Sequence, residues 1–232
     1  GAKAAPSYAY AKSIIKVINE VANLVNHDQT IGDKLKIVFL PNYNVSLAEK
    51  IIPAADVSEQ ISLASKEASG TSNMKLMLNG AITIATLDGA NVEIRDAVGD
   101  ENIYIFGLTE AEVYAYYENK NYSSREVYET NPIVHRVLNA FVDGSIPNIE
   151  REGQEIVDSL LLYNDEYFLL RDFDAYCKAQ ARLNQDYQDA THWQKCSLIN
   201  IANAGTFSAD KTVKQYAEDI WQIEPLFAHK GR

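Results

Sequence analysis

Apolar residues recur at helical spacing in the first part of the chain, and then at the spacing of short strands. Between residues 8 and 25 they follow a period of 3.6, which predicts an amphipathic helix; they are Ala11, Ile14, Ile18, Val21 and Val25. The segment "KLKIVFL", residues 34–40, predicts a buried strand, which the turn residues "PNYN" end. A helix over residues 45–52 is expected next, with Ser46 as its N-cap and Glu49 as the partner of a capping box.

Helices and β-branched strands alternate from there to residue 107. The pattern predicts strands over residues 81–87 and 102–107, a helix over 72–80 that ends at Gly80, and another over 89–99. The short segment "AADVSEQIS", residues 54–62, is expected to be a strand end that opens into a loop. Such alternation indicates an α/β fold with a largely parallel sheet. Beyond residue 107 every periodic segment predicts a helix, the last with Ser208 as its cap. We therefore expect an α/β part over residues 1–107 and a helical extension over 108–232, and too few strands for a complete doubly wound sheet.

Composition and charge exclude several classes of protein. The 232 residues carry a net charge of −11, which disfavours nonspecific binding to nucleic acids and to anionic membranes. No apolar run approaches the roughly 18 residues of a membrane span. Two separated cysteines, Cys177 and Cys196, predict a reducing, cytoplasmic location without a disulfide framework or structural zinc site. The histidines show no metal-ligand spacing, so no metal site is expected; they are His27, His135, His192 and His229.

The candidate chemistry lies in "EASGTSNMKLMLNGAITIATLDGANVEI", residues 67–94. Small residues before a helix expose backbone N–H groups that suit a phosphate, and Lys75 follows one turn later. The spacing does not form a Walker A motif, because the second glycine and the following Ser/Thr are missing. An apolar flank would favour the neutral amine that a Schiff base with pyridoxal phosphate (PLP) needs. The pattern alone equally describes a surface lysine of an amphipathic helix, which is the more common case.

The same segment resembles the PLP-binding signature of the α-glucan phosphorylases, the family of glycogen, starch and maltodextrin phosphorylases. The resemblance extends to "GDKLKIVFLPNYNVSLAEKIIPAADVSEQIS" before the signature and to "NIYIFG" and "FSADKTVKQYAEDIW" after it. It is weakest over residues 110–165. It implies the Rossmann-like C-terminal portion of a glycosyltransferase-B-type fold with a helical extension.

Residue by residue, the resemblance implies a cofactor site and a sugar site. Lys75 would form the Schiff base with PLP, the cofactor's phosphate would be held by Gly70, Thr71 and the backbone of Ser72, and Tyr43 would lie near its ring. The glucose pocket would consist of the Glu67 carboxylate and backbone groups of Ala68, Ser69 and Gly70.

Three positions depart from the family pattern. Ser72 and Ala85 stand where glycine is usual, and Asn44 stands where many members carry arginine. The replacement of glycine by Ser72 would strain the backbone only if this position needs a positive φ. The family's N-terminal domain and a basic phosphate-binding segment are not in this sequence, so we expect a C-terminal fragment that is inactive alone.

The implied reaction is the reversible phosphorolysis of terminal α-1,4-glucosidic bonds to glucose 1-phosphate. The expected partners are an α-1,4-glucan, inorganic phosphate or glucose 1-phosphate, the N-terminal domain, and a second copy in a homodimeric parent. The alternatives are a non-catalytic PLP- or sugar-binding module, a structural fragment, and a nucleotide-sugar glycosyltransferase, which the lysine motif disfavours.

A tyrosine-rich stretch, "VYAYYENKNY" at residues 113–122, allows two interpretations. Its rings would suit stacking against carbohydrate, but packing of an amphipathic helix is the more common explanation.

Overall fold

The computed structural model describes Gly1 and residues 3–224, and compactness divides the chain into two units. The first unit consists of residues 1–51 and 107–178, and the second of residues 52–106 together with the chain from residue 179 onward. The sequence analysis divided the chain by type of secondary structure, into residues 1–107 and 108–232. This division and the two compact units agree only on a boundary near residue 107.

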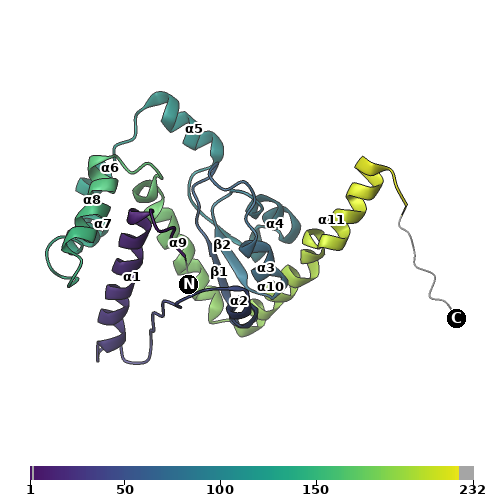
Figure 1. Ribbon diagram of the computed structural model, residues 1–232, viewed down its shortest axis with the longest axis horizontal. Coiled ribbons are helices and arrows are strands. Elements are labelled where there is room, and N and C mark those ends of the chain that lie inside the picture. The colour runs from purple at the N-terminus through teal and green to yellow at the C-terminus, as the bar shows by residue number, and fades with distance from the viewer. Residues whose placement is uncertain (2, 225–232) are drawn as a thin grey trace. The chain divides into compact units, whose positions relative to one another are not determined.

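The regular secondary structure of the first unit consists of helices joined by loops, among its described residues (Figure 1). Its helices are α1 (Ala9–His27), α2 (Val45–Ile51), α5 (Glu110–Asn119), α6 (Ser124–Thr130), α7 (Pro132–Ala140), α8 (Glu150–Val157) and the first half of α9 (Leu169–Tyr187). A π-helical turn, Asp158–Leu162, extends α8. The helices predicted around residues 8–25 and beyond residue 107 are therefore confirmed.

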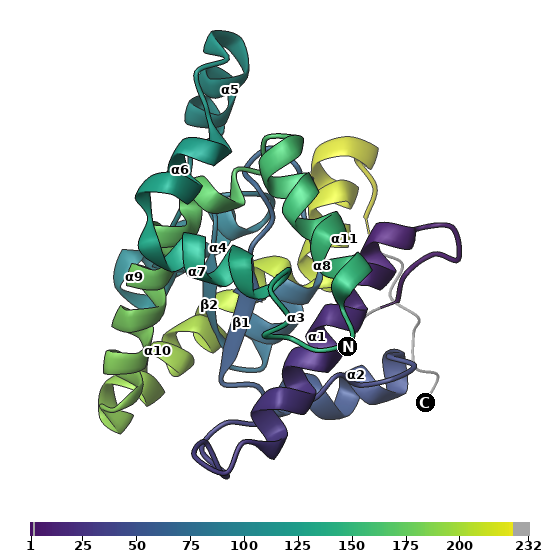
Figure 2. The same ribbon diagram turned by 90° about the vertical axis from the view of Figure 1, so that its left-hand side faces the viewer.

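Helices α1 and α8 pack side by side, as Figures 1 and 2 show. Their packing has an apolar core, made of Val17, Val134, Leu138, Ile149, Ile156, Leu160 and Leu170. At the edge of this core the Lys16 ammonium forms an ion pair of 2.9 Å with Glu152, and the Ser13 hydroxyl donates to Glu155. Helix α8 begins close beneath α7, because a Cβ on Gly153 would lie 2.0 Å from the Phe141 carbonyl oxygen. Only glycine fits there.

The predicted strand over residues 34–40 is wrong. This segment is extended but pairs with no strand in the described chain, and Val38 is 68% exposed. The side-chain amide of Asn26 bonds both the N–H and the carbonyl of Ile37, at 2.9 and 2.7 Å, in place of a neighbouring strand. The predicted cap of the next helix is also wrong: Asn44, not Ser46, accepts the Leu47 N–H, at 3.1 Å.

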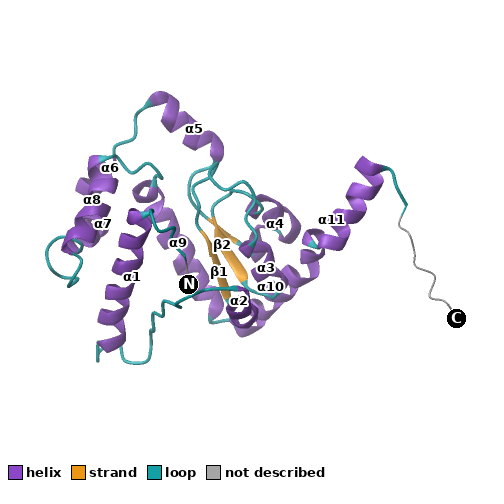
Figure 3. Cartoon of the chain, in the orientation of Figure 1, coloured by secondary structure: helices purple, strands orange, loops and turns teal. Residues whose placement is uncertain are grey.

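The second unit contains a small parallel sheet in the order β1-β2-β3, so the predicted α/β character is confirmed in this reduced form. The strands, drawn orange in Figure 3, are β1 (Val57–Gln60), β2 (Ile82–Ala85) and β3 (Tyr104–Ile105). Val57 pairs with Ile82, and Ile84 with Tyr104. Strand β2 is buried along its whole length, as expected for the centre of a parallel sheet.

Helices cover this sheet and close its core. They are α3 (Ser72–Leu78), α4 (Asn91–Val98), the end of α9, α10 (Ala190–Asn203) and α11 (Ala209–Gln215), which Ser208 caps as predicted. Helix α10 packs on α3 and β2, and its buried Asn200 donates to the Asn102 carbonyl at 2.9 Å. The apolar cluster beneath α3 joins Met77, Ile94, Val98, Ile103 and Ala204. Among the described residues, no helix has the length and apolar content that crossing a bilayer requires.

In the first unit, the half-buried carboxylate of Asp172 stabilises a turn at Gly107. Gly107 has φ +81°, and a Cβ there would lie 2.6 Å from Asp172 Oδ2. The Leu108 N–H donates to Asp172 Oδ1 at 3.0 Å. Burial raises the pKa of Asp172 to about 6; the Leu108 amide and Arg171 act against this rise, and the Asp165 and Glu112 carboxylates add to it.

Because folding raises this pKa, the protonated form is favoured in the native state. The stability that Asp172 contributes is complete below about pH 4 and is lost as the pH rises through about 6. We expect Asp172→Asn, which keeps the acceptor for Leu108, to gain about 1–2 kcal/mol relative to wild type between pH 4 and pH 7.5, allowing for solvent screening of the half-exposed carboxyl. Urea unfolding followed by circular dichroism measures the difference. The exposed Asp33→Asn is the control, and a pH-independent difference for Asp172→Asn would contradict the assignment.

Candidate functional site

Except for Tyr43, the predicted site residues lie on a loop at the carboxyl edge of the parallel sheet and on the helix that follows it. Residues 61–71 connect β1 to α3, and residues 86–90 connect β2 to α4. Because neighbouring parallel strands end at the same edge of a sheet, these two loops meet, and this edge is where α/β folds commonly bind ligands. We call residues 61–71 the β1–α3 loop and residues 86–91, which include the first residue of α4, the anchor loop.

The Asp88 carboxylate in the anchor loop holds the β1–α3 loop. Asp88 is 7% exposed, and its two oxygens accept the N–H groups of Ser65, at 2.9 Å, and Glu67, at 2.7 Å. Ser65 has φ +82°, a conformation that is costly for a residue with a Cβ. A charge-assisted hydrogen bond at that residue offsets part of this cost. The bond also fixes the backbone from which Glu67 extends.

Backbone contacts continue this attachment toward the start of α3. The Ala90 N–H donates to the Ser69 carbonyl at 2.7 Å, and the Thr86 hydroxyl donates to the Ser62 carbonyl. Gly89 has φ +52°, and a Cβ there would lie 2.6 Å from the Ser69 carbonyl oxygen. The two loops therefore approach so closely that only glycine fits at position 89.

Two buried amides complete the junction. Asn73 Nδ2 donates to Asn91 Oδ1 at 3.0 Å and to the Ser69 carbonyl at 3.3 Å, and Asn91 Nδ2 donates to the Thr86 carbonyl at 3.2 Å. Both side chains are at least 95% buried, so their polar groups need such partners. The first turn of α3 is thereby fixed to the anchor loop.

The exposed side of this junction carries free backbone donors. Gly70 has φ +79°, and among the described residues no acceptor is bonded to the N–H of Gly70, Thr71 or Ser72. The Ser72 hydroxyl bonds the Gln60 side chain at the end of β1. Ser72 has no positive φ, so its replacement of a glycine does not strain the backbone.

Lys75 lies on the exposed face of α3. Residues three and four apart share a face of a helix, so Lys75 is on the same side as Ser72 and Thr71, and all three are exposed. Within the described residues its ammonium has no hydrogen-bond or ion-pair partner. Met77, in contrast, is fully buried in the core beneath the helix. Of the apolar residues expected to surround Lys75, Met77 therefore packs away from it, while Met74 and Leu76 are half-buried.

The sequence-predicted residues fall into two groups. The structure brings Glu67, Ala68, Ser69, Gly70, Thr71, Ser72 and Lys75 together on one loop and the helix that follows it. Glu67, Ala68 and Ser69 are exposed, and the Glu67 carboxylate has no partner among the described residues. Tyr43 belongs to the first unit and is not part of this group.

The anchor loop was missed by the sequence analysis. Its signal is the Asp-Gly pair of "TLDGAN" directly after a buried strand, where an acid can turn back onto neighbouring backbone N–H groups. No group of three or more His, Cys, Asp or Glu side chains suited to a metal ion occurs within residues 1 and 3–224; His229 lies outside them.

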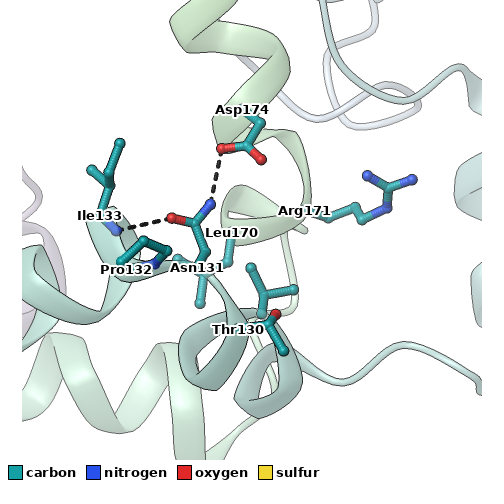
Figure 4. Close-up of a pocket in the computed structure, with 8 residues that line it drawn as sticks. Thr130, Asn131, Pro132, Ile133, Leu170, Arg171 and Asp174 are labelled. Carbon is teal, nitrogen blue, oxygen red and sulfur yellow. Dashed lines mark hydrogen bonds between the residues drawn. The ribbon is translucent and has the colours of Figure 1, made fainter.

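A pocket of about 480 Å³ in the first unit uses its polar groups for structure. Figure 4 shows the Asn131 side chain between the start of α7 and Asp174 of α9. Its oxygen accepts the Ile133 N–H at 3.0 Å, and its nitrogen donates to Asp174 at 2.9 Å. The Arg171 guanidinium points away from this pair and donates to Tyr116. Asn131 thus caps helix α7, and the residues that line the pocket present no convergent reactive groups.

Comparison with known proteins gives consistent matches. The family model described as "Carbohydrate phosphorylase" matches residues 1–223. The chain is 53% identical to a glycogen phosphorylase of Bacillus subtilis over 226 residues, 48% to one of Synechocystis over 227, and 47% to the human liver form over 229. Each match covers 97% of this chain but only 26–28% of the relative. The chain thus spans about a quarter of the length of these relatives.

We expect Asp88→Asn to loosen the β1–α3 loop selectively. Asparagine offers one oxygen, so one of the two N–H groups loses its acceptor and faces an amide NH₂ instead. A hydrogen bond to a charged group contributes about 1.5–3 kcal/mol, which predicts exchange of the Ser65 and Glu67 amides faster by roughly 10–150-fold. Hydrogen exchange followed by mass spectrometry or NMR measures this in the 232-residue chain.

The control for this variant is Asp96→Asn, an exposed acid on α4. Strand β2 should exchange at its wild-type rate in both proteins. Unchanged exchange of the Ser65 and Glu67 amides in Asp88→Asn, or equal acceleration throughout the unit, would refute the role given to Asp88.

Proposed function

Because the chain belongs to the carbohydrate phosphorylase family, we propose that it is the C-terminal part of an α-glucan phosphorylase. The complete protein would carry out the reversible phosphorolysis of terminal α-1,4-glucosidic bonds to glucose 1-phosphate, in the cytoplasm. The three-stranded sheet would be part of the Rossmann-like half of a glycosyltransferase-B-type fold. One observation carries the proposal: Glu67, the free N–H groups of residues 70–72 and the Lys75 amine all occupy the exposed side of one fixed loop and its helix.

The residues of this loop fit a phosphate-bearing cofactor, which we propose to be PLP. The N–H groups at residues 70–72 lack acceptors, and Gly70 leaves the approach to them open because it carries no side chain. Lys75 would hold the cofactor through a covalent bond from Nζ. The cofactor would supply a phosphate group with a second pKa of about 6, suited to exchanging a proton with the substrate phosphate near neutral pH. Thr71 and Ser72 would add hydroxyl donors.

Glu67 would orient the sugar. Its carboxylate accepts hydrogen bonds from two neighbouring hydroxyl groups, and charge-assisted bonds of this type are the stronger ones. The Asp88 attachment fixes the backbone of Glu67, so on sugar binding only the side chain of Glu67 has conformational freedom to lose. The exposed backbone of residues 68–70 would bond further hydroxyls. The net charge of −11 requires that the phosphates also meet positive groups from the rest of the protein.

We expect Lys75→Ala, in the full-length protein that carries this chain, to abolish both cofactor retention and phosphorolysis. The reason is that no other group on the exposed face of α3 offers an amine. Absorbance in the near ultraviolet and visible measures the bound cofactor, and borohydride reduction followed by peptide mass spectrometry locates its attachment. Lys50→Ala, at an exposed helix end, is the control. Stoichiometric cofactor in the Lys75 variant would overturn the proposal.

We expect Glu67→Gln to weaken catalysis while cofactor content stays the same. The substitution keeps the size of the side chain but removes its charge, which costs about 1.5–3 kcal/mol in a hydrogen bond to a sugar hydroxyl. The predicted fall in kcat/KM for glucose 1-phosphate is roughly 10–150-fold. Glu93→Gln on α4 is the matched control. Wild-type kinetics in the Glu67 variant would show that this carboxylate does not contact the sugar.

A further inference from the structure

The C-terminal end of α3 contains a pair of residues that is prone to a chemical change. Asn79 and Gly80 form the only Asn-Gly sequence in the 232 residues. A glycine after an asparagine leaves the next backbone nitrogen unshielded, because no Cβ covers it. That nitrogen can attack the carbon of the side-chain amide and close a five-membered ring. The proposed reaction does not use this pair.

The way in which α3 ends requires the glycine. Gly80 has φ +88°, and its N–H donates to the Met77 carbonyl at 3.0 Å. The Ala81 N–H donates to the Leu76 carbonyl at 3.1 Å. These two bonds form a Schellman motif, in which a glycine adopts the positive φ. The cap of α3 therefore places a glycine directly after an asparagine.

Both reacting groups are hydrogen-bonded in the native turn. Asn79 is exposed, and its side-chain nitrogen, which would be the leaving group, donates to the Lys75 carbonyl at 2.8 Å. The backbone nitrogen of Gly80, which would be the attacking group, is held by its bond to Met77. Ring closure therefore requires that the turn opens first. The rate of ring closure then depends on how often this local opening occurs.

A serine of α10 holds the turn closed. The Ser197 hydroxyl donates to the Gly80 carbonyl at 2.8 Å, and a Cβ on Gly80 would lie 2.7 Å from this hydroxyl. A Cβ there would also lie 3.1 Å from the Ile201 side chain. Gly80 is buried against these two residues. Because the turn cannot open without breaking the Ser197 bond, this contact limits the opening.

We propose that Asn79 is a site of spontaneous deamidation, with water as the reactant and the Ser197–Gly80 contact as its gate. The Gly80 nitrogen loses its proton and bonds to Asn79 Cγ, and the side-chain nitrogen leaves as ammonia. Water then adds to one of the two ring carbonyls and breaks the bond from that carbon to the ring nitrogen. The product is aspartate or isoaspartate at position 79, and no oxidant or cofactor takes part.

The change adds a negative charge one helical turn from Lys75. Residues four apart lie on the same face of a helix, and the exposed Lys75 ammonium has no partner among the described residues. A carboxylate at position 79 would supply one. An amine that is held as an ammonium ion is a poorer nucleophile. The consequence for cofactor attachment rests on the proposed function, whereas the deamidation itself does not.

The test is peptide mass spectrometry of the folded 232-residue chain during incubation in warm, mildly alkaline buffer. Deamidation should accumulate at Asn79 and not at Asn203, which is also exposed at a helix end but is followed by alanine. Ser197→Ala should deamidate roughly 2–10-fold faster, as expected from the loss of one neutral hydrogen bond. Thr191→Ala, at an exposed position of the same helix, is the matched control and should behave like wild type. In urea, all three proteins should deamidate at one higher rate.

Acetylation of lysines measures the effect of the added charge. Asn79→Asp should slow the acetylation of Lys75 roughly twofold, as expected for an exposed charge pair at this spacing, and should leave that of Lys50 unchanged. Neither measurement needs a cofactor or a substrate, so both remain valid if the proposed function fails. The inference is overturned if Asn203 deamidates as fast as Asn79, if Ser197→Ala deamidates no faster than Thr191→Ala, or if Asn79→Asp leaves the acetylation of Lys75 at the wild-type rate.

Discussion

The carboxylate of Asp88 is the interaction on which the candidate site depends. A loop of eleven residues between β1 and α3 has no regular structure of its own, and its backbone N–H groups would otherwise bond water. Two of them converge on one buried acid, at Ser65 and Glu67. The strained backbone at Ser65 thereby becomes part of a defined conformation, and the residues that follow it are presented outward at fixed positions.

The close contact at Gly89 adds a steric condition to this electrostatic one. The carboxyl edge of a parallel sheet brings neighbouring loops near each other. Here the two loops can come this close only because Gly89 has no Cβ. The Asn73–Asn91 pair then joins the starts of α3 and α4 beneath the exposed surface. These buried amides fix the shape of the junction, while the N–H groups of residues 70–72, which have no acceptor among the described residues, lie on its exposed side, where a ligand can reach them.

The sequence predicted the parts of the fold that local pattern determines. The periodicity of α1, the alternation that gives β1 to β3, and the cap at Ser208 were all confirmed. The segment at residues 34–40 has the composition of a strand, but a strand forms only when a neighbour supplies its hydrogen bonds, and Asn26 supplies them here instead. The sequence also did not show which residues of α3 face the core and which lie beside Lys75. Met74, Leu76 and Met77 are its neighbours in the chain, but the direction of each side chain depends on the orientation of the helix. Asp88 was overlooked for a related reason: its partners are 21 and 23 residues away in the chain.

The division of the second unit into two separate segments has a consequence for synthesis. Strands β1 to β3 and helices α3 and α4 are complete by residue 106, but α10 begins roughly 80 residues later. At about 5–20 residues per second, a ribosome needs roughly 4–16 s to supply it. During that interval Met77 and Ile103 lack the cover that Ala204 and its neighbours later provide. The nascent sheet therefore presents an apolar surface for seconds, and chaperones that bind such surfaces have their opportunity at this stage of translation.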